Sequence, residues 1–202
     1  MTKIKICGIT TENDITYLNE AGVDFAGFVQ FYPKSKRNIP IETAVRLMKK
    51  LSPRIKRVAV VVSPGKEELE MIAQAGFDLV QIHGSIPDEF LDEIGLPVWK
   101  AFNVSDLSEF ERFLNHPKVT GFVFDAQTPG SGKGFDWELL SGIPHTDKLT
   151  MLAGGIHPGN VAEAIRITKV DGVDTSSGVE DDSGNGKSRE KIQAFVKAVR
   201  EL

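Results

Sequence analysis

Short apolar runs alternate along the chain with segments in which apolar residues recur every three or four positions. Runs rich in Val, Ile and Phe are typical of buried strands, whereas the second spacing places apolar side chains on one face of a helix. A regular alternation of such strands and helices favours parallel strands joined by crossover helices. The pattern therefore predicts a series of βα units.

Eight strands and eight helices are predicted in this way. The strands are expected at residues 3–7, 24–30, 57–62, 78–83, 98–102, 119–124, 149–153 and 172–175. The helices are expected from Thr11 to Gly22, around 44–51, from Ser63 to Gly76, at 87–94, from Ser105, from residue 135, from Pro158 and around 192–199. At roughly 25 residues per unit these elements make a compact (β/α)8 barrel, an α/β fold, and we expect residues 1–202 to form it as a single domain.

The positions of two turns rich in glycine and serine distinguish this fold from the alternative, a doubly wound open sheet. That sheet would place one glycine-rich turn after its first strand. Here the turns are Gly154-Gly155 and Ser176-Ser177-Gly178, after the seventh and eighth predicted strands. Glycine lets the backbone approach an anion, and a helix N-terminus adds partial positive charge. Because barrel enzymes often hold phosphate at these two turns, the sequence predicts a site for a small phosphate ester.

The composition is that of one soluble globular domain. Of 202 residues, 41% are hydrophobic, which is enough for one core. The formal net charge is -4, from 24 basic and 28 acidic residues without a basic stripe, so no nucleic-acid partner is expected. The longest purely apolar run, 58–62, is too short for a membrane span, and no signal peptide is expected. A single cysteine, Cys7, excludes an internal disulfide and fits a reducing cytoplasm.

Other familiar chemistries are not indicated by the sequence. The four histidines show no ligand spacing and there is no cysteine cluster, so no metal site is expected. Residues 130–134 resemble a P-loop superficially, but position 127 is Gln127 and Lys133 is followed by Gly134. We expect a flexible loop over the site there, and a mobile polar loop at 180–187. A GxSxG nucleophile elbow is absent.

Functional groups of a (β/α)8 barrel project from the carboxyl ends of its strands. This rule selects Cys7, Gln30, His83, Asp125, Gly154-Gly155 and the segment 174–178. Strands one and six flank the predicted phosphate site. Cys7 and Asp125 are therefore expected to face each other across a ligand, where a thiolate and a carboxylic acid can act as general base and general acid.

Each of these residues also fits a structural role. A lone cysteine at a strand end is more often a small buried hydrophobic residue than a catalyst. Asp125 also fits a cap of its own loop, and His83 fits a hydrogen-bonded structural histidine. Asp174 fits a position at the mouth of the barrel or a pairing with a nearby N–H. From these residues alone both interpretations stay open.

Six segments in chain order resemble the phosphoribosylanthranilate isomerase family, which catalyses the third step of tryptophan biosynthesis. They are residues 5–10 (KICGIT), 27–29 with 35–37, 80–84 (VQIHG), 130–133 with 135–137, 152–156 with 158 and 160–161, and 173–180 (VDTSSGVE). They span nearly the whole chain and fall at predicted strand ends. The combination is therefore far more specific than any one segment.

The resemblance implies a set of site residues. Cys7 of KICGIT would be the general base, and Asp125 at the end of the sixth strand would be the general acid. The substrate-binding residues would be Arg37, at the anthranilate end, and Gln81, His83 and Asp174. The phosphate would bind to backbone and hydroxyl groups of Gly154, Gly155, Ser176, Ser177 and Gly178.

The implied reaction is an Amadori rearrangement of N-(5-phosphoribosyl)anthranilate. Asp125 would protonate the ring oxygen and open the furanose to a Schiff base, and the Cys7 thiolate would remove the C2 proton. The resemblance implies no redox cofactor and no metal. The expected partner is a small phosphorylated substrate, with no nucleic acid or membrane, and the chain is expected to be a monomer or a homodimer.

Three other functions are weighed against this one. A sugar-phosphate epimerase on the same barrel would require metal-ligating histidines. A histidine-pathway isomerase would typically carry paired aspartates where this chain has Cys7 and Asp125. A barrel that only binds a phosphorylated metabolite would need neither residue.

Overall fold

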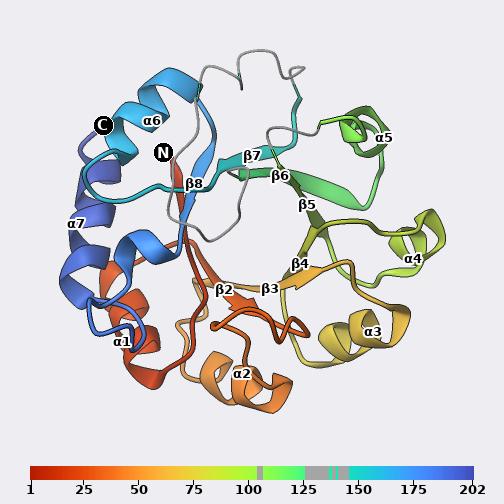
Figure 1. The fold of residues 1–202 in the computed structure, drawn as a ribbon, viewed down its shortest axis with the longest axis horizontal. Coiled ribbons are helices and arrows are strands. Elements are labelled where there is room, and N and C mark those ends of the chain that lie inside the picture. The colour runs from red at the N-terminus through yellow and green to blue at the C-terminus, as the bar shows by residue number, and fades with distance from the viewer. Residues whose placement is uncertain (104–106, 126–136, 138–139, 141–145) are drawn as a thin grey trace.

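Eight parallel strands form a closed ring, β1 to β8 in chain order, and β8 pairs with β1 (Figure 1). The computed structural model describes residues 1–103, 107–125, 137, 140 and 146–202. The strands are β1 Lys3–Cys7, β2 Phe25–Val29, β3 Lys56–Val62, β4 Leu79–His83, β5 Val98–Asn103, β6 Val119–Asp125, β7 Leu149–Leu152 and β8 Gly172–Thr175. The predicted (β/α)8 barrel is confirmed, and the open sheet is excluded because the ring is closed.

Helices surround the ring on its outer side (Figure 1). Within the described residues they are α1 Glu12–Ala21, α2 Ile41–Met48, α3 Lys66–Gln74, α4 Asp88–Glu93, α5 Phe110–Leu114, α6 Val161–Thr168 and α7 Arg189–Arg200, with a 3-10 turn η2 at Ser177–Val179. The helix starts expected at Ser105 and at residue 135 lie outside the described residues. None of the described helices is both long and apolar enough to cross a membrane.

The start of α3 differs from the sequence prediction. Ser63 and Pro64 do not begin the helix; its N-cap is Gly65, whose backbone N–H is accepted by the Glu68 carboxylate at 2.9 Å. Ser63 instead has a left-handed backbone (φ 46°), and its hydroxyl accepts the backbone N–H of Ser85 at 3.1 Å. The hydroxyl that resembled a helix cap therefore joins the loops after β3 and β4.

The start of α6 was predicted too early. α6 begins at Val161 rather than at Pro158, and Asn160 is its N-cap. Residues 158–160 form a turn before this helix, and apolar spacing alone does not mark such a turn. The described part of α5 is Phe110–Leu114.

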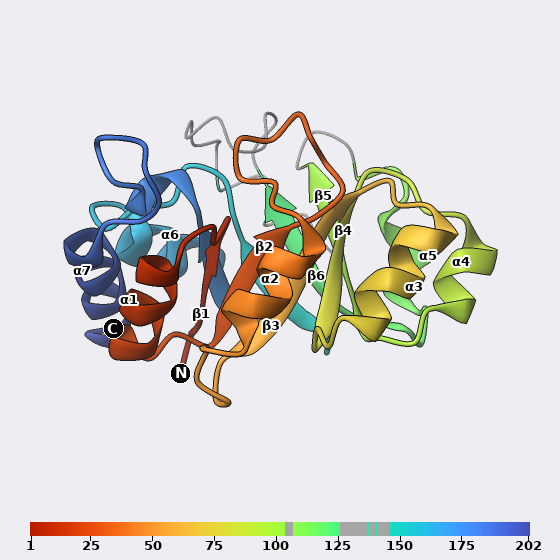
Figure 2. The ribbon, with the colours of Figure 1, turned by 90° about the horizontal axis from the view of Figure 1, so that it is seen from below.

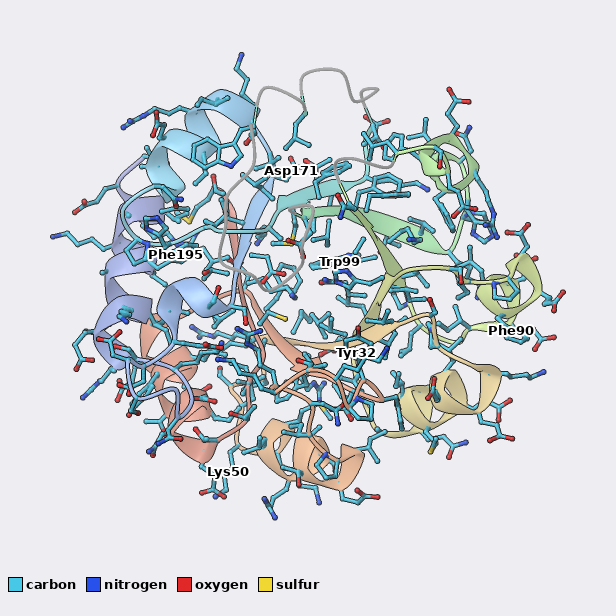
Figure 3. All side chains as sticks on the ribbon, viewed as in Figure 1. Tyr32, Lys50, Phe90, Trp99, Asp171 and Phe195 are labelled. Carbon is cyan, nitrogen blue, oxygen red and sulfur yellow. The ribbon has the colours of Figure 1, made fainter. Side chains whose placement is uncertain are left out.

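The ring encloses a small core of its own, distinct from the layer between strands and helices. Trp99 lies near the centre of the ring in Figure 3 and packs edge-on against Phe25, with ring centroids 4.7 Å apart. Outside the ring, Phe102 packs against Phe110 and Phe113, with centroids 5.5 and 5.8 Å away. Successive side chains of a strand point to opposite faces, so each strand contributes side chains both to the core inside the ring and to the layer between strands and helices.

One buried carboxylate joins the two ends of the chain. Thr11 caps α1, and Asp14 completes the capping box by accepting the Thr11 backbone N–H at 2.9 Å. The other oxygen of Asp14 accepts the backbone N–H of Lys187 at 2.8 Å, just before α7. This contact ties α1 to the last helix, beside which it lies in Figure 1.

The loops after β2 and β8 rise above the same end of the barrel (Figure 2). Because all eight strands are parallel, their carboxyl ends meet at this end. Any group that follows a strand directly therefore has access to a shared mouth.

We expect Asp14→Ala to lower the free energy of unfolding by on the order of 3 kcal/mol, since backbone N–H groups that now bond this buried carboxylate would lose their acceptor. Urea unfolding measures the change. Thr16→Ala is the matched control, because it removes an exposed hydroxyl of the same helix that donates to the Glu12 carbonyl within its own turn. If both variants were equally stable, Asp14 would not join the chain ends.

Candidate active site

A cavity of about 520 Å³ opens at the carboxyl ends of the strands. Most residues predicted for the site line it: Cys7, Arg37, Gln81, His83, Asp125, Gly154, Gly155, Asp174, Ser176 and Ser177. Thr175, within the selected segment 174–178, also contributes to its wall, as do Tyr32, Lys34 and Lys36, which were not predicted as site residues.

Cys7 ends β1 and Asp125 ends β6, and both border this one cavity. β7 and β8 lie between these two strands in the ring. Asp125 is 8% exposed and thus nearly shielded from solvent. A thiol and a carboxyl group therefore reach the same space from either flank of the loops after β7 and β8.

The loops after β7 and β8 offer unpaired backbone donors. Gly154 and Gly155 have left-handed backbones (φ 81° and 70°), which glycine adopts without strain. Within the part of the chain that the structure describes, the backbone N–H groups of Gly154, Gly155 and Ser176 have no hydrogen-bond partner. Adjacent unpaired N–H groups bordering a cavity suit an anion such as phosphate.

Gly178 was expected among the phosphate-binding residues but does not line the cavity. A Cβ at this position would stand 2.2 Å from the carbonyl oxygen of Ile156. The same carbonyl accepts the Thr175 hydroxyl at 2.6 Å. Glycine is therefore required at position 178 because the loops after β7 and β8 touch there.

The Ser176 hydroxyl is already engaged within the protein. It donates to the carbonyl oxygen of Cys7 at 2.9 Å and accepts from Nζ of Lys187 at 3.2 Å. Lys187 also donates to the Ser176 carbonyl at 3.0 Å, and burial lowers the pKa of Lys187 to about 8. Glu180 and Lys187 form an antiparallel bridge, so the loop expected to be mobile is anchored at both ends.

Arg37 reaches the rim of the cavity from the segment after β2. Its aliphatic stem lies over Gly8, where a Cβ would meet Cδ of Arg37 at 2.3 Å. Its Nε donates to Glu180 at 2.5 Å, and Lys36 donates to the same carboxylate at 2.8 Å. Burial alone would raise the pKa of Glu180, but these two hydrogen bonds keep it below its ordinary value. Arg37 thus joins the loops after β2 and β8.

Gln81 and His83 face the cavity side by side from β4, with their Nε2 atoms 2.9 Å apart. Because an amide nitrogen only donates, Nε2 of His83 accepts and the ring proton sits on Nδ1. Burial, together with the positive charges of Lys5 and Lys100, lowers the pKa of His83 to about 3. His83 is therefore a neutral hydrogen-bonding group at physiological pH.

Gln30 was selected as a strand-end candidate but does not line the cavity. Its side-chain amide donates to the carbonyl of Val29 at 2.9 Å, and it is buried. Val29 faces the cavity, so the next residue along the chain points to the other side.

Lys5 is a further residue beside the site that was not predicted from the sequence. Its fully buried ammonium forms an ion pair with Oδ2 of Asp174 at 2.6 Å. Burial alone would lower the pKa of Lys5, but its attraction to Asp174 and Cys7 raises it. Oδ1 of Asp174 is buried and has no hydrogen-bond partner in the described residues. A signal was present: Lys5 precedes Cys7 by two positions and thus shares its inward face.

Comparisons with known proteins show which family the chain resembles. A family model described as N-(5'phosphoribosyl)anthranilate (PRA) isomerase matches residues 4–198. The chain is 40% identical to N-(5'-phosphoribosyl)anthranilate isomerase of Thermoanaerobacter sp. (strain X514), over 99% of this chain and 98% of that protein. It is also 40% identical to the enzyme of the same name from Thermotoga maritima, over 100% of both chains.

Two solved structures are similar over the full length of both chains. The crystal structure of phosphoribosyl anthranilate isomerase from Thermotoga maritima superposes with a TM-score of 0.88 at 39% identity. A crystal structure of the enzyme in complex with reduced 1-(o-carboxyphenylamino)-1-deoxyribulose 5-phosphate gives 0.85 at 36% identity.

We expect the imidazole signals of His83 not to titrate in NMR spectra between pH 8 and 5, because its pKa of about 3 lies below that range. A His83→Asn variant assigns the signals. In the urea-unfolded protein the same ring should titrate near the ordinary value of about 6.5. Since the folded pKa is the lower one, His83 should destabilise the fold as pH falls below about 6.5 and have no such effect above it. A midpoint near 6.5 in the folded protein would contradict the neutral form of His83 at physiological pH.

Proposed function

Because the chain belongs to the N-(5'-phosphoribosyl)anthranilate isomerase family, we propose that it carries out this isomerisation with Asp125 as the general acid and Cys7 as the general base. One observation supports the assignment most strongly. The two groups line a single cavity, on either side of backbone donors after β7 and β8 that have no partner among the described residues. A proton donor and a proton acceptor on either side of an anchored sugar phosphate suit the opening and isomerisation of an aldose.

The substrate phosphate binds at the end of the cavity formed by the loops after β7 and β8. The donors there are the backbone N–H groups of Gly154, Gly155 and Ser176 and the hydroxyl of Ser177. The Ser176 hydroxyl stays bonded to the Cys7 carbonyl, so it shapes the loop instead of donating to phosphate.

The anthranilate end of the substrate lies toward the segment after β2. Arg37, Lys34 and Lys36 border the cavity there and can attract its carboxylate. Gln81, His83 and Asp174 contact the sugar between the two ends. Buried oxygens of Gln81 and Asp174 that lack a partner in the described residues are suited to accept hydrogen bonds from sugar hydroxyls.

The first step is opening of the furanose ring. Asp125 in its acid form gives a proton to the ring oxygen, while the amine lone pair forms a C=N bond and the bond from C1 to the ring oxygen breaks. The products of this step are an iminium with a free C4 hydroxyl and the Asp125 carboxylate. Asp125 is 8% exposed, so its proton is delivered in a site with little competing water.

The second step is removal of the C2 proton by the Cys7 thiolate. The electrons of the C2–H bond form a C1=C2 bond, and the iminium nitrogen becomes neutral, which leaves an enolamine. Ketonisation then moves a proton from the C2 hydroxyl to C1. The proton gained by Cys7 returns to Asp125 through solvent, so both groups end in their starting forms. Because no electrons leave the substrate, this isomerisation needs no redox cofactor.

The thiol at position 7 favours this function over the related ones. Paired aspartates would support a histidine-pathway isomerase, but here a cysteine occupies one of the two flanking positions. A protein that only binds a phosphorylated metabolite would have no need of either group. The single cysteine also fits the cytoplasm, where thiols stay reduced, as the place where the enzyme works.

We expect Cys7→Ser and Asp125→Asn each to lower kcat by at least about 100-fold, because a positioned acid or base contributes roughly 10²–10⁴-fold. Substrate binding should be largely kept, since phosphate and carboxylate contacts remain. The assay follows turnover of the anthranilate ribotide. Asp88→Asn is the matched control, since Asp88 pairs with Arg112 at the surface of α4 and should leave kcat unchanged. Full activity in either variant would remove that residue from its role.

We expect Ser177→Asp to raise KM at least about tenfold, equivalent to about 1.4 kcal/mol, because a carboxylate would repel the substrate phosphate. Ser177→Asn adds a side chain of similar size without charge and serves as the control. Competitive inhibition by inorganic phosphate should weaken in the first variant far more than in the second. Equal effects of the two substitutions would place the phosphate elsewhere.

A further inference from the structure

Lys5 is a buried cation that the mechanism above does not use. Its side chain is fully shielded from solvent, and Nζ donates to Oδ2 of Asp174 at 2.6 Å. The two residues stand opposite each other in the β1–β8 register. They sit at the barrel wall directly below the end of β1, where Cys7 is located.

Cys7 shares the inward face of β1 with Lys5. Gly27 on β2 lies beside both groups. A Cβ there would lie 2.9 Å from Sγ of Cys7 and 3.1 Å from Nζ of Lys5. The thiol and the ammonium therefore approach the same point, and glycine at position 27 keeps that space open.

Three charged groups act on the Cys7 thiol. Burial raises its pKa, and the Lys5 ammonium opposes this more strongly than any other group. The Asp174 carboxylate raises the pKa as well, whereas the Lys187 ammonium lowers it. A half-buried thiol that must act as a base therefore needs a counter-charge, and Lys5 is placed to supply it.

We propose that Lys5 is the counter-charge of the Cys7 thiolate and that Asp174 competes with the thiolate for it. Lys5 acts as a positioning residue, because it works through Cys7. When Cys7 is a thiol, the ammonium pairs with Asp174 alone. When Cys7 loses its proton, the ammonium lies between two anions. If Asp174 then loses its charge, the Lys5 ammonium stabilises the Cys7 thiolate more strongly. The inference rests on the proposed function only in taking Cys7 as the base.

The test measures the ionisation of Cys7 in the ligand-free protein. Cys7 is the sole cysteine of the sequence, so thiolate ultraviolet absorbance and the rate of alkylation by iodoacetamide report on it alone. The variants are Asp174→Asn and the double variant Lys5→Met with Asp174→Asn. The double variant leaves no buried charge unpaired, unlike Lys5→Met alone. Lys3→Met with Asp24→Asn is the control, because it removes an ion pair at the far end of β1.

The expected order of the Cys7 pKa is Asp174→Asn lowest, wild type and control in the middle, and the double variant highest. Asp174→Asn removes the carboxylate that repels the Cys7 thiolate, and the Lys5 ammonium can then pair with the thiolate alone. The double variant also loses Lys5, whose attraction is the larger of the two effects. We expect at least about a tenfold smaller thiolate fraction at a given pH in the double variant than in Asp174→Asn, one unit of pKa. The acid limb of kcat/KM should shift in the same direction.

Equal pKa values in Asp174→Asn and the double variant would overturn the proposal, as would a double variant at or below the wild type. This outcome is distinct from failure of the proposed function. If Cys7→Ser kept isomerase activity, Cys7 would not be the base, yet the order of pKa values in the ligand-free protein would still decide the role of Lys5.

Discussion

The pairing of β8 with β1 closes the ring and fixes the groups on which the chemistry depends. This register places Lys5 opposite Asp174, and Cys7 follows on the same inward face. A slip of one residue would turn each of these side chains to the opposite face of the sheet. Breaking such a buried ion pair by removing one partner typically costs about 3–5 kcal/mol, so correct closure and a paired Lys5 depend on each other.

Closure also arranges charge around the cavity. Lys34, Lys36 and Arg37 border the mouth on the β2 side, whereas Asp125 lies on the side of β6. The chain as a whole carries a net charge of -4. A local group of cations on an acidic protein favours an anionic ligand at that place without attracting polyanions to the whole surface. Glu180 holds Lys36 and Arg37 in place through hydrogen bonds to both.

Much of the fold can be predicted from the sequence, because apolar runs and their spacing report directly on burial. The strand ends at Cys7 and Asp125 are predicted correctly for this reason. The pairing of Lys5 with Asp174 is not, since it depends on the register of strands 169 residues apart in the sequence. A lysine in KIKIC has the spacing of an exposed strand residue until the barrel closes around it. Gly178 shows the same limit, because its requirement for glycine comes from contact with the loop after β7.

The most direct test is a crystal structure of this protein with reduced 1-(o-carboxyphenylamino)-1-deoxyribulose 5-phosphate bound. The account predicts phosphate on the backbone N–H groups of Gly154 and Gly155, the ligand C2 beside Sγ of Cys7, and the hydroxyl on C4 at the Asp125 carboxyl. A ligand whose phosphate lies elsewhere, or whose C2 and C4 are out of reach of these two side chains, would contradict it.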